Sequence, residues 1–446
     1  MKLHPYIILA SVVGMVQALH MDTNNLTNIK QNAALVADGL MNYYDGYRRG
    51  GTIGKFIPPY YWWEAGGAWG SLIDYSYYME NNTYHDVIQQ AMEYQTGDDY
   101  NYIPLNESTT EGNDDQGFWG VAVIAAAEKN FTNPKDPKKQ WLALAQAVFN
   151  TMSARWDPEH CGGGLRWQIF QWNSGYNYKN SVSNGCLFHI GARLARYTGN
   201  DSYADWSEKV WDWMIDSDLI IPGPYWKIVD GLEVDNCSDI SPYQWTYNHG
   251  LFLAGCAYLY NYTEDEKWRN RTLELLKGAV VFFGTEYDIM YEAACQPSNT
   301  CNQDQRSFKA YFSRFLGLTM TLVPETEAVI RPWLVNAANA AANSCSGGTD
   351  GVTCGLNWFT GGWDGKFGLG EQMCALEAMT NLQANKFPIY TATTGGSSQG
   401  NPAGGYAVTN TNASPLKLGA GDTAGAGIIT AIIGVSIVAS GVWLVL

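Results

Sequence analysis

The chain has 446 residues and a formal net charge of −16 at pH 7, with 43 Asp and Glu against 27 Lys and Arg. This acidic balance argues against a nucleic-acid-binding protein, because phosphate groups need Lys and Arg as partners. It suits a neutral or basic ligand, or simply solubility.

The N-terminus has the features of a secretory signal peptide over residues 1–18. Lys2 precedes an apolar run over residues 6–16, and Ala18 completes the pattern that signal peptidase accepts. A run this short spans the roughly 30 Å of hydrocarbon in a bilayer poorly, which argues against an uncleaved anchor. A buried N-terminal helix is the other alternative. We therefore predict cleavage after Ala18 and entry into the secretory pathway.

Residues 19–390 repeat one pattern six times. An aromatic- and Gly-rich segment leads each time into an apolar run with many small residues, and successive segments lie roughly 50 to 67 residues apart. The six segments are 62–69, 114–119, 180–185, 247–250, 309–312 and 361–365. The length would make two domains the default, but no linker divides this region. We predict a single domain.

Amphipathic segments lie between the repeats, for example 137–155, 203–216 and 264–283, and strand signals are scarce. Ser202 and Thr263 are the expected N-caps of the last two. Helices that are apolar nearly all round need neighbours on every side, whereas amphipathic helices face water on one side. We predict an all-α fold, an (α/α)6 barrel with six inner and six outer helices. The starts of the inner helices then gather at one end.

That end of the barrel suits sugar binding. Aromatic residues make up 14% of the chain, including 18 Trp and 28 Tyr. Their rings offer flat apolar faces, and Tyr and Trp add hydrogen-bond donors. The alternative is that many of these rings are core or helix-capping residues, which for any single Trp is at least as good an explanation.

Asp114 and Asp115 are the candidate catalytic residues, at the start of the second inner helix. Glycoside hydrolysis usually needs one protonated and one ionised carboxyl, about 5–5.5 Å apart in retaining enzymes. Two close carboxylates resist joint ionisation, so one pKa rises and that group serves as the acid. Alternatively, the pair only stabilises the helix N-terminus, where acidic residues are favoured.

Other motifs are weaker. His249 is a possible substrate ligand, but a lone His is more often structural. The six His and nine Cys show no His-x-x-x-His or Cys-x-x-Cys spacing, so no metal site is predicted. Residues 161–164 lack the Lys-Ser/Thr of a phosphate-binding loop and indicate a tight turn, and no Gly-x-Ser-x-Gly motif occurs. No cofactor is predicted.

The C-terminal region predicts a stalk and a glycosylphosphatidylinositol (GPI) signal. Residues 391–412 are rich in Gly, Ser, Thr and Asn, which is typical of a stalk. Residues 413–446 hold a polar spacer and an uncharged apolar tail with nothing basic after it. A transmembrane helix normally keeps Lys or Arg on its cytoplasmic side, so a removed GPI signal is favoured over that alternative. Asn412 is the predicted attachment residue, with Gly419 and Gly421 as rivals.

Nine Asn-x-Ser/Thr sequons suit a glycosylated surface protein. They begin at Asn25, Asn81, Asn106, Asn130, Asn200, Asn236, Asn261, Asn270 and Asn412. The nine Cys are compatible with disulfides in an oxidising compartment. Cys295/Cys301 and Cys345/Cys354 are close enough in sequence to be natural pairs, and an odd count leaves at least one Cys without an intrachain partner.

The residues around the aspartate pair resemble those of a known family. The block at 113–116 (Asn-Asp-Asp-Gln), together with the signal-to-anchor layout, is similar to that of the fungal mannan endo-1,6-α-mannosidases of glycoside hydrolase family 76. The likeness is greatest to the GPI-anchored members that act in cell-wall biogenesis. It covers nearly the whole mature chain, including residues 161–167 and 244–248.

The resemblance implies an (α/α)6 barrel, retention of configuration, Asp114 as nucleophile and Asp115 as general acid/base. It also implies transglycosylation, from α-1,6-mannan or a GPI glycan as donor to wall glucan as acceptor, without a metal. The expected location is the outer face of the plasma membrane, held only by the GPI lipid, or the wall itself. A catalytically silent carbohydrate-binding wall protein is the alternative, and the intact aspartate pair argues against it. From their expected place at the barrel mouth, the substrate-binding candidates are Trp119, Tyr247, Asn248, Trp363 and Asp364.

Overall fold

The computed structural model describes residues 19–107, 109–286 and 288–405, together with Thr430 and Ile433. The predicted signal peptide over 1–18, the predicted attachment residue Asn412 and almost all of the predicted GPI signal over 413–446 lie outside the described residues.

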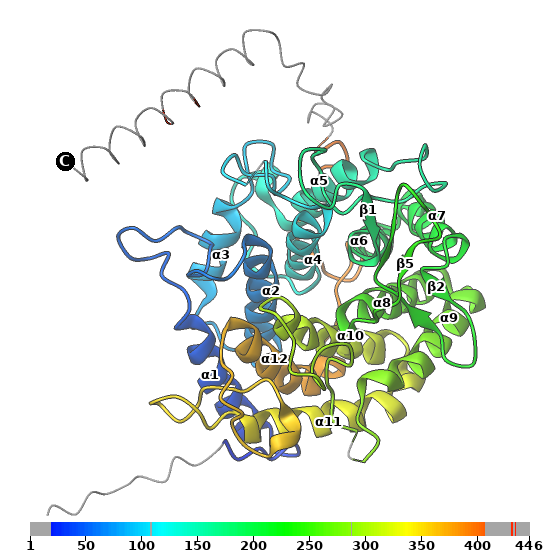
Figure 1. Cartoon of the computed structure of the whole chain (residues 1–446). Coiled ribbons are helices and arrows are strands. Elements are labelled where there is room, and N and C mark those ends of the chain that lie inside the picture. Colours follow the sequence, from blue (N-terminus) through cyan, green and yellow to red (C-terminus); the bar gives the residue numbers. More distant parts are fainter. Residues whose placement is uncertain (1–18, 108, 287, 406–429, 431–432, 434–446) are drawn as a thin grey trace, which may run out of the picture. The chain divides into compact units, whose positions relative to one another are not determined.

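Twelve α-helices form two concentric rings in the described part of the chain (Figure 1). The inner helices are α2 (Trp62–Tyr78), α4 (Asn113–Glu128), α6 (Ser181–Thr198), α8 (Thr246–Thr263), α10 (Phe308–Leu322) and α12 (Leu369–Thr380). Each inner helix contacts the next, and α12 contacts α2, so the ring closes. The outer helices are α1 (Leu26–Met41), α3 (His85–Tyr94), α5 (Trp141–Ala154), α7 (Asp201–Asp216), α9 (Glu266–Gly278) and α11 (Glu327–Ser344). This arrangement confirms the predicted (α/α)6 barrel.

Burial explains which helices lie inside. Helix α4 is buried on every side except at its first turn, whereas α7 buries a single stripe that includes Val210 and Trp211. Small residues let the inner helices approach closely. A Cβ on Gly117 would lie 2.5 Å from the Cβ of Cys186 on α6, and one on Gly120 would lie 2.6 Å from Ile190. The small-residue runs of the sequence are therefore a packing requirement.

Three helix starts differ from the predictions. The sixth inner helix begins at Leu369, so the segment 361–365 is a loop, with Gly361 and Gly365 at positive φ. Helix α7 is capped by Asn200, because its side chain accepts the N–H of Ser202 at 3.1 Å. Helix α9 is capped by Asp265, which accepts the N–H of Lys267. The expected caps, Ser202 and Thr263, were wrong by two residues each.

Two small antiparallel sheets lie in the connections around α6 and α8 (Figure 1). One has the order β1 (Tyr178–Asn180), β4 (Gly231–Glu233) and β5 (Ile240–Ser241); the other pairs β2 (Ile220–Ile221) with β3 (Lys227–Ile228). Tyr178 pairs with Glu233 and Asn180 with Gly231. Short 3-10 helices lie at Pro137–Lys139, Ala279–Phe282, Gln305–Ser307, Pro324–Thr326, Trp358–Thr360 and Asn381–Lys386.

The C-terminal part of the barrel is followed by an ordered strap, residues 391–405. The N–H of Tyr390 donates to the carbonyl of Glu128 at 2.8 Å, at the end of α4. The strap then runs along α5: the N–H of Leu142 donates to Ser398 Oγ at 2.9 Å, and Asn150 Nδ2 donates to the carbonyls of Pro402 and Gly404. This corrects the predicted stalk over 391–405, which belongs to the folded domain.

Disulfides join Cys295 to Cys301 and Cys345 to Cys354, as predicted. A third, between Cys161 and Cys237, spans 76 residues and was not predicted. The three remaining Cys, at positions 186, 256 and 374, are buried thiols.

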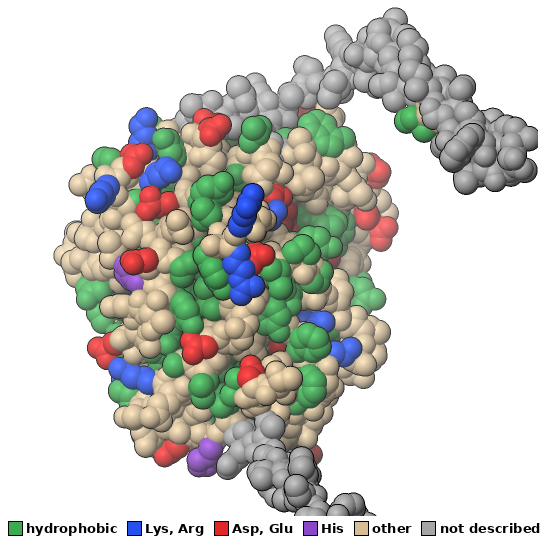
Figure 2. Space-filling view, turned by 90° about the vertical axis from the view of Figure 1, so that its left-hand side faces the viewer, with side chains coloured by type: hydrophobic (Ala, Val, Ile, Leu, Met, Phe, Trp, Pro, Cys, Tyr) green, Lys and Arg blue, Asp and Glu red, His purple; other side chains and the backbone are tan. Residues whose placement is uncertain are grey.

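Six of the eight sequon Asn in the described residues are exposed, and Asn81 and Asn130 are half-buried. Asn130 holds the strap, because its Nδ2 donates to the carbonyl of Gly395 and its Oδ1 accepts the N–H of Ser397. Glycosylation itself stays a prediction. On the side of the barrel that carries α1 and α3, charges of both signs are scattered among hydrophobic side chains (Figure 2). Within the described residues, no helix combines the length and apolarity needed to cross a bilayer.

Candidate active site

A cavity of about 630 Å³ lies at the end of the barrel where the inner helices start. Its walls combine aromatic rings with carboxyl groups. The aromatic lining residues are Tyr61, Trp62, Trp63, Phe118, Trp167, Tyr178, Trp245, Tyr247 and Phe308, and the acidic ones are Glu107, Glu111, Asp114, Asp115, Asp230 and Asp304. No Lys, Arg or His is among the described residues that line it. A neutral or basic ligand therefore suits the cavity, as the composition predicts.

Asp114 and Asp115 lie in the first turn of α4, behind the N-cap Gly112. The N–H of Gly112 donates to Asp115 Oδ2 at 2.5 Å, and the N–H of Asp115 donates to Asp114 Oδ1 at 3.1 Å. A Cβ on Gly112 would lie 2.3 Å from Asp114 Oδ1 and 3.1 Å from Asp115 Oδ2. The two carboxyl groups therefore converge beside the Cα of Gly112, where only a glycine fits without displacing them.

The start of α4 is held from the side by Asn113. Its N–H donates to the carbonyl of Trp167 at 2.8 Å, and its Nδ2 donates to the carbonyl of Arg166 at 2.9 Å. Its Oδ1 accepts from Arg155 Nε at 2.7 Å, and Arg155 also donates to Gln116 on the next turn. The helix start and the segment 166–168 are thus one rigid unit around the aspartates.

The aspartate pair carries a proton at neutral pH. Burial raises the pKa of Asp115 to about 7, although the Gly112 N–H lowers it, and Asp304 and Glu107 raise it further. Burial and the neighbouring Asp115 raise the pKa of Asp114 well above its usual range, against hydrogen bonds that include one from the Trp167 side chain. Two interacting carboxyls give up their protons one after the other. One acid and one base are therefore available together, as glycoside hydrolysis requires.

Four further carboxyls line the cavity and were not predicted, namely Glu107, Glu111, Asp230 and Asp304. Glu107 pairs with Lys55 at 2.5 Å. Asp230 accepts hydrogen bonds from Tyr178 Oη at 2.6 Å and Trp245 Nε1 at 2.8 Å. Asp304 accepts from Trp63 Nε1 at 3.1 Å. Glu111 is buried, and neither of its carboxyl oxygens has a hydrogen-bond partner in the described part of the chain. Asp304 lies four residues before α10. Its position next to the aromatic start of an inner helix is the sequence signal from which its place in the site could have been predicted.

Of the five predicted substrate-binding residues, Tyr247 lines the cavity. Its ring stacks on Phe308 with centroids 3.8 Å apart and planes 7° from parallel. Trp119 is fully buried between Trp62 and Tyr102, at 5.1 and 5.0 Å, so its ring supports Trp62 from behind. Asn248 is fully buried and does not line the cavity. The predictions for Trp119 and Asn248 are corrected, because both side chains are fully buried and neither lines the cavity.

Trp363 and Asp364 also lie outside the cavity, because the sixth inner helix starts later than predicted. Asp364 accepts the N–H groups of Leu356, Asn357 and Lys366 and so fixes its own loop. Trp363 is 40% exposed, and its Nε1 donates to the carbonyl of Lys366 at 2.6 Å.

His249 is structural. It is buried, and its Nε2 lies 2.7 Å from the carbonyl of Leu275. Among the described residues, no group of three or more His, Cys, Asp or Glu is arranged to hold a metal ion.

Comparison with known proteins identifies the family. The family model described as "Glycosyl hydrolase family 76" matches residues 28–393. The chain belongs to glycosyl hydrolase family 76. It is therefore a glycoside hydrolase, and its fold agrees with the resemblance seen in the sequence.

Relatives within family 76 match along their whole length. The chain is 65% identical to mannan endo-1,6-alpha-mannosidase DCW1 of Candida albicans, over all of both chains. It is 50% identical to mannan endo-1,6-alpha-mannosidase DFG5 of Saccharomyces cerevisiae, over 96% of this chain and 94% of that one.

Two solved structures resemble that of this chain. Dfg5 from Chaetomium thermophilum, solved in complex with glucosamine, is 40% identical with a TM-score of 0.82, covering 86% of this chain and 97% of that one. The α-1,6-mannanase GH76A of Salegentibacter sp. HEL1_6 has a TM-score of 0.63 at 16% identity, over 80% of this chain and 99% of that one, which is a likeness of fold.

Proposed function

We propose that this family 76 protein is a retaining, endo-acting α-1,6-mannosidase and transglycosidase of the fungal cell surface. The observation that carries the proposal is the pair of adjacent carboxyls that share a proton in an acidic, aromatic cavity. The choice of an α-1,6-linked mannoside is supported by the names of the relatives, which are mannan endo-1,6-alpha-mannosidases at 50–65% identity.

In this mechanism Asp114 attacks the anomeric carbon and forms a glycosyl ester, while Asp115 gives its proton to the departing glycosidic oxygen. Asp115, now ionised, then takes a proton from the acceptor hydroxyl as that oxygen attacks the ester and releases Asp114. Water as acceptor gives hydrolysis, and a sugar hydroxyl gives transfer. The negative charges of Asp230 and Asp304 in the cavity wall would favour the positive charge that develops on the sugar ring.

We further propose that the donor is α-1,6-mannan or a GPI glycan and that the acceptor is wall glucan. The support comes from the predicted address: the signal peptide over 1–18, the GPI signal over 413–446, and the sequons. An enzyme held at the outer face of the plasma membrane by a GPI anchor stands among other proteins held in the same way, and the glucan lies above it. An enzyme that releases GPI-anchored proteins to the wall would also release itself by the same reaction.

The test compares wild type with Asp114→Asn and Asp115→Asn on α-1,6-linked manno-oligosaccharides, with products followed by mass spectrometry. Asp205→Asn, an exposed change on outer helix α7, is the matched control. Each active-site variant is expected to lose on the order of 10²- to 10⁴-fold in kcat. A glycosyl adduct on Asp114 that accumulates in Asp115→Asn would support the role assignment, and an adduct on Asp115 would reverse it.

Other outcomes separate the remaining alternatives. If wild type turns nothing over and all four proteins bind the sugar alike, the protein is a catalytically silent carbohydrate-binding wall protein. If both active-site variants keep full activity, the proposed site is wrong. Adding a glucan oligosaccharide tests the acceptor: transfer gives a covalent mannosyl-glucan product, whereas hydrolysis alone leaves the glucan unchanged.

A further inference from the structure

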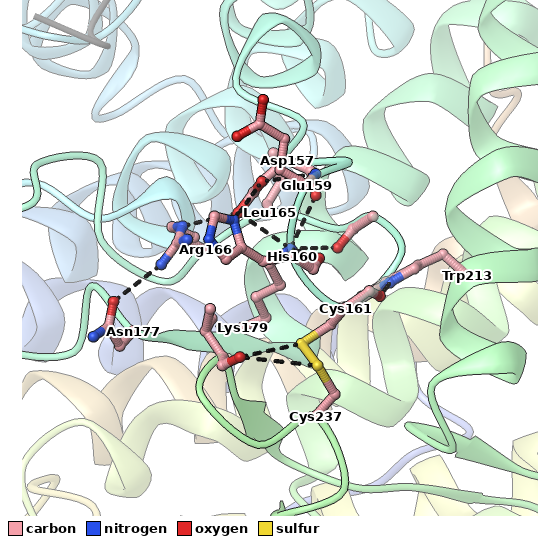
Figure 3. A network of polar contacts seen from close by, with 12 residues as sticks. Asp157, Glu159, His160, Cys161, Leu165, Arg166, Asn177, Lys179, Trp213 and Cys237 are labelled. Atoms are coloured by element: carbon pink, nitrogen blue, oxygen red, sulfur yellow. Dashed lines mark hydrogen bonds and ion pairs between the residues drawn. A yellow bond between two sulfur atoms is a disulfide. The ribbon is translucent and has the colours of Figure 1, made fainter.

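Figure 3 shows a cluster of charged side chains, and none of its charged residues lines the cavity. At its centre Lys179, on strand β1, is fully buried. Its Nζ donates to the carbonyls of Asp157, His160 and Gly163 at 3.0, 2.6 and 2.5 Å, and lies 3.4 Å from Asp157 Oδ2. An ammonium has three N–H groups, so these carbonyls use its full capacity. The lysine thereby fixes the backbone of the loop 157–163 at three points.

Asp157 contacts the three basic side chains of the cluster. Its carboxylate accepts from Arg166 Nε at 3.0 Å, lies 3.0 Å from His160 Nδ1, and accepts the N–H of Glu159 at 3.2 Å. Burial raises the pKa of this carboxyl, but His160, Lys179 and Arg166 together hold it below its usual value. Asp157 is therefore the ionised partner that makes the buried ammonium of Lys179 tolerable.

A disulfide locks the same loop. Cys161 is joined to Cys237, in the turn that follows β4, and the carbonyl of Cys161 accepts from Trp213 Nε1 at 2.9 Å. Figure 3 shows the disulfide next to Lys179, with Trp213 on its far side. The loop is thus tied to strand β1, to the turn after β4 and to helix α7 at once, and has little freedom to move.

The cluster reaches the catalytic pair through one segment, Arg166 and Trp167. Arg166 is held by Asp157, and the carbonyls of Arg166 and Trp167 accept both N–H donors of Asn113, the residue before Asp114. The N–H of Trp167 donates to the carbonyl of Tyr178 at 2.7 Å, next to Lys179. The bonds of Asp157 to Arg166 and of Asn113 to Arg166 are part-buried, whereas Trp167 itself is 37% exposed.

We propose that Asp157 and Lys179 are positioning residues, which hold the Arg166–Trp167 backbone where it sets the start of α4 and with it Asp114 and Asp115. Neither touches the cavity, so their role is to preserve geometry and not to bind sugar. The consequence for turnover rests on the proposed glycosidase function. A shift of about 1 Å in reacting groups can reduce a rate on the order of 10²-fold.

The test measures kcat, KM and the pH profile of kcat/KM for Asp157→Asn, Asp157→Glu and the control Asp205→Asn on an α-1,6-manno-oligosaccharide. Asp157→Asn is expected to lower kcat about 10- to 100-fold with KM within about twofold. Its alkaline limb is expected to move to higher pH, because a displaced Gly112 N–H no longer lowers the pKa of Asp115. Asp157→Glu restores part of the rate, and Asp205→Asn leaves it unchanged.

Hydrogen exchange supplies a readout that needs no activity. The amide of Asn113, bonded to Trp167, is expected to exchange faster in Asp157→Asn than in wild type or Asp205→Asn. If wild type is inactive on the mannoside, the proposed function fails while this measurement still decides the positioning role. Unchanged exchange at Asn113 overturns that role.

A second variant covers the case in which Asp157→Asn does not fold with Lys179 left unpaired. The double variant Asp157→Asn/Lys179→Met removes both charges and is expected to show the same loss of kcat and the same shift of the pH profile. Wild-type kcat in a folded variant overturns the proposal. So does a loss of kcat with an unchanged pH profile and no rescue by Asp157→Glu, and so does failure of both variants to fold, since each then marks a purely structural cluster.

Discussion

At the scale of single residues, the candidate site depends on Gly112, the glycine that precedes the proposed catalytic pair. Gly112 has an ordinary extended conformation, with φ −91° and ψ 167°, so its backbone needs no glycine. The reason for glycine is space, because the carboxyl groups of Asp114 and Asp115 occupy the volume where a Cβ would be. The absent side chain is therefore part of the active site.

Gly112→Ala is expected to reduce kcat on the order of 10²-fold, because the added methyl displaces both carboxyl groups. Its effect on the free energy of unfolding is expected to be about 1–2 kcal/mol, because alanine is a poorer N-cap and the new Cβ also lies 3.0 Å from the backbone oxygen of Trp167. Steady-state kinetics and urea unfolding measure the two effects. Gly362→Ala, where a Cβ meets nothing within 4 Å, is the control. Full activity in Gly112→Ala would contradict this account.

The pKa of Asp115 gives a stability prediction with a definite sign. The folded protein holds this proton up to a pKa of about 7, whereas the unfolded chain loses it near the ordinary value of 3.8. The folded state therefore binds more protons in this window, and the stability contributed by Asp115 falls as pH rises from about 4 to 7. Asp115→Asn, which removes the buried charge, is expected to be much less active and yet more stable than wild type at pH 7, on the order of 1 kcal/mol. Melting temperatures at pH 4 and pH 7 test this, and the difference is expected to vanish at pH 4.

The same carboxyl pair predicts the pH dependence of catalysis. One proton must stay on the pair, so kcat/KM for the free enzyme is expected to fall once the pair loses its last proton, at a pH that burial and the mutual repulsion of the carboxyls raise above their usual pKa range. Initial rates across pH 4 to 9 locate this limb, and a rate that keeps rising to pH 9 would show that the pair does not supply the acid.

At the scale of elements, composition is a poor guide to the C-terminal strap. Residues 391–405 are polar and Gly-rich, a composition that predicted a stalk. The same polar groups can also form hydrogen bonds with polar side chains of an outer helix, and here they do so with α5. Gln146 on α5 accepts the N–H of Asn401 at 2.6 Å, and Asn150 donates to two strap carbonyls. Such long-range polar pairing leaves no periodic signal in the sequence.

A chain that ends at Tyr390 is expected to unfold more easily than one that ends at Gly405, by on the order of 2–4 kcal/mol, because each lost hydrogen bond contributes about 1 kcal/mol and α5 becomes exposed. Asn150→Ala in the longer chain is expected to lose about 1–2 kcal/mol of this. Urea midpoints of the three proteins give the comparison. Equal urea midpoints for the chains that end at Tyr390 and at Gly405 would show that residues 391–405 do not stabilise the domain, as expected of a stalk.

At the scale of the whole molecule, α4 joins the two ends of the barrel. It carries the aspartates in its first turn and Glu128 in its last, a rise of about 20 Å. Glu128 accepts from Arg193 Nε at 3.1 Å and from Tyr258 Oη at 2.9 Å, so α4, α6 and α8 meet in a buried ion pair. A comparable ion pair joins Arg314 of α10 to Glu377 of α12. These ion pairs join particular inner helices, so the order of helices in the ring depends on polar contacts as well as on apolar packing.

Glu128→Gln is expected to lower the free energy of unfolding by about 3–5 kcal/mol, because Arg193 is left charged and buried without its carboxylate. The matched surface change, Glu325→Gln, removes one of the two carboxylate partners of Arg269, and the side chains of Arg269 and Glu325 are 32% and 41% exposed. It is expected to change stability far less than Glu128→Gln does, because solvent screens an exposed pair. Chemical denaturation of both variants tests the contrast, and equal effects would mean that burial of the pair is unimportant.

What the sequence determined by itself is local or periodic. The sequence alternates between segments that are apolar all round and segments that are amphipathic. This alternation predicts two layers of helices, because the pattern of apolar residues around a helix shows which of its faces are buried. The aspartate pair was found for the same reason: adjacent residues at a helix start are close in any fold that forms that helix. Cys295/Cys301 and Cys345/Cys354 were likewise decided by short separation.

Only the tertiary structure decided which side chains face the cavity. Trp62 and Trp119 both stand near inner-helix starts, yet Trp62 lines the cavity and Trp119 packs behind it, because that depends on how α2 and α4 rotate against each other. Asp230 and Asp304 join the site from connections far apart in the chain. The Cys161–Cys237 bond and the strap also pair distant segments. Such contacts between distant segments form only when the ring of helices closes, so they cannot be predicted from any single segment of the sequence.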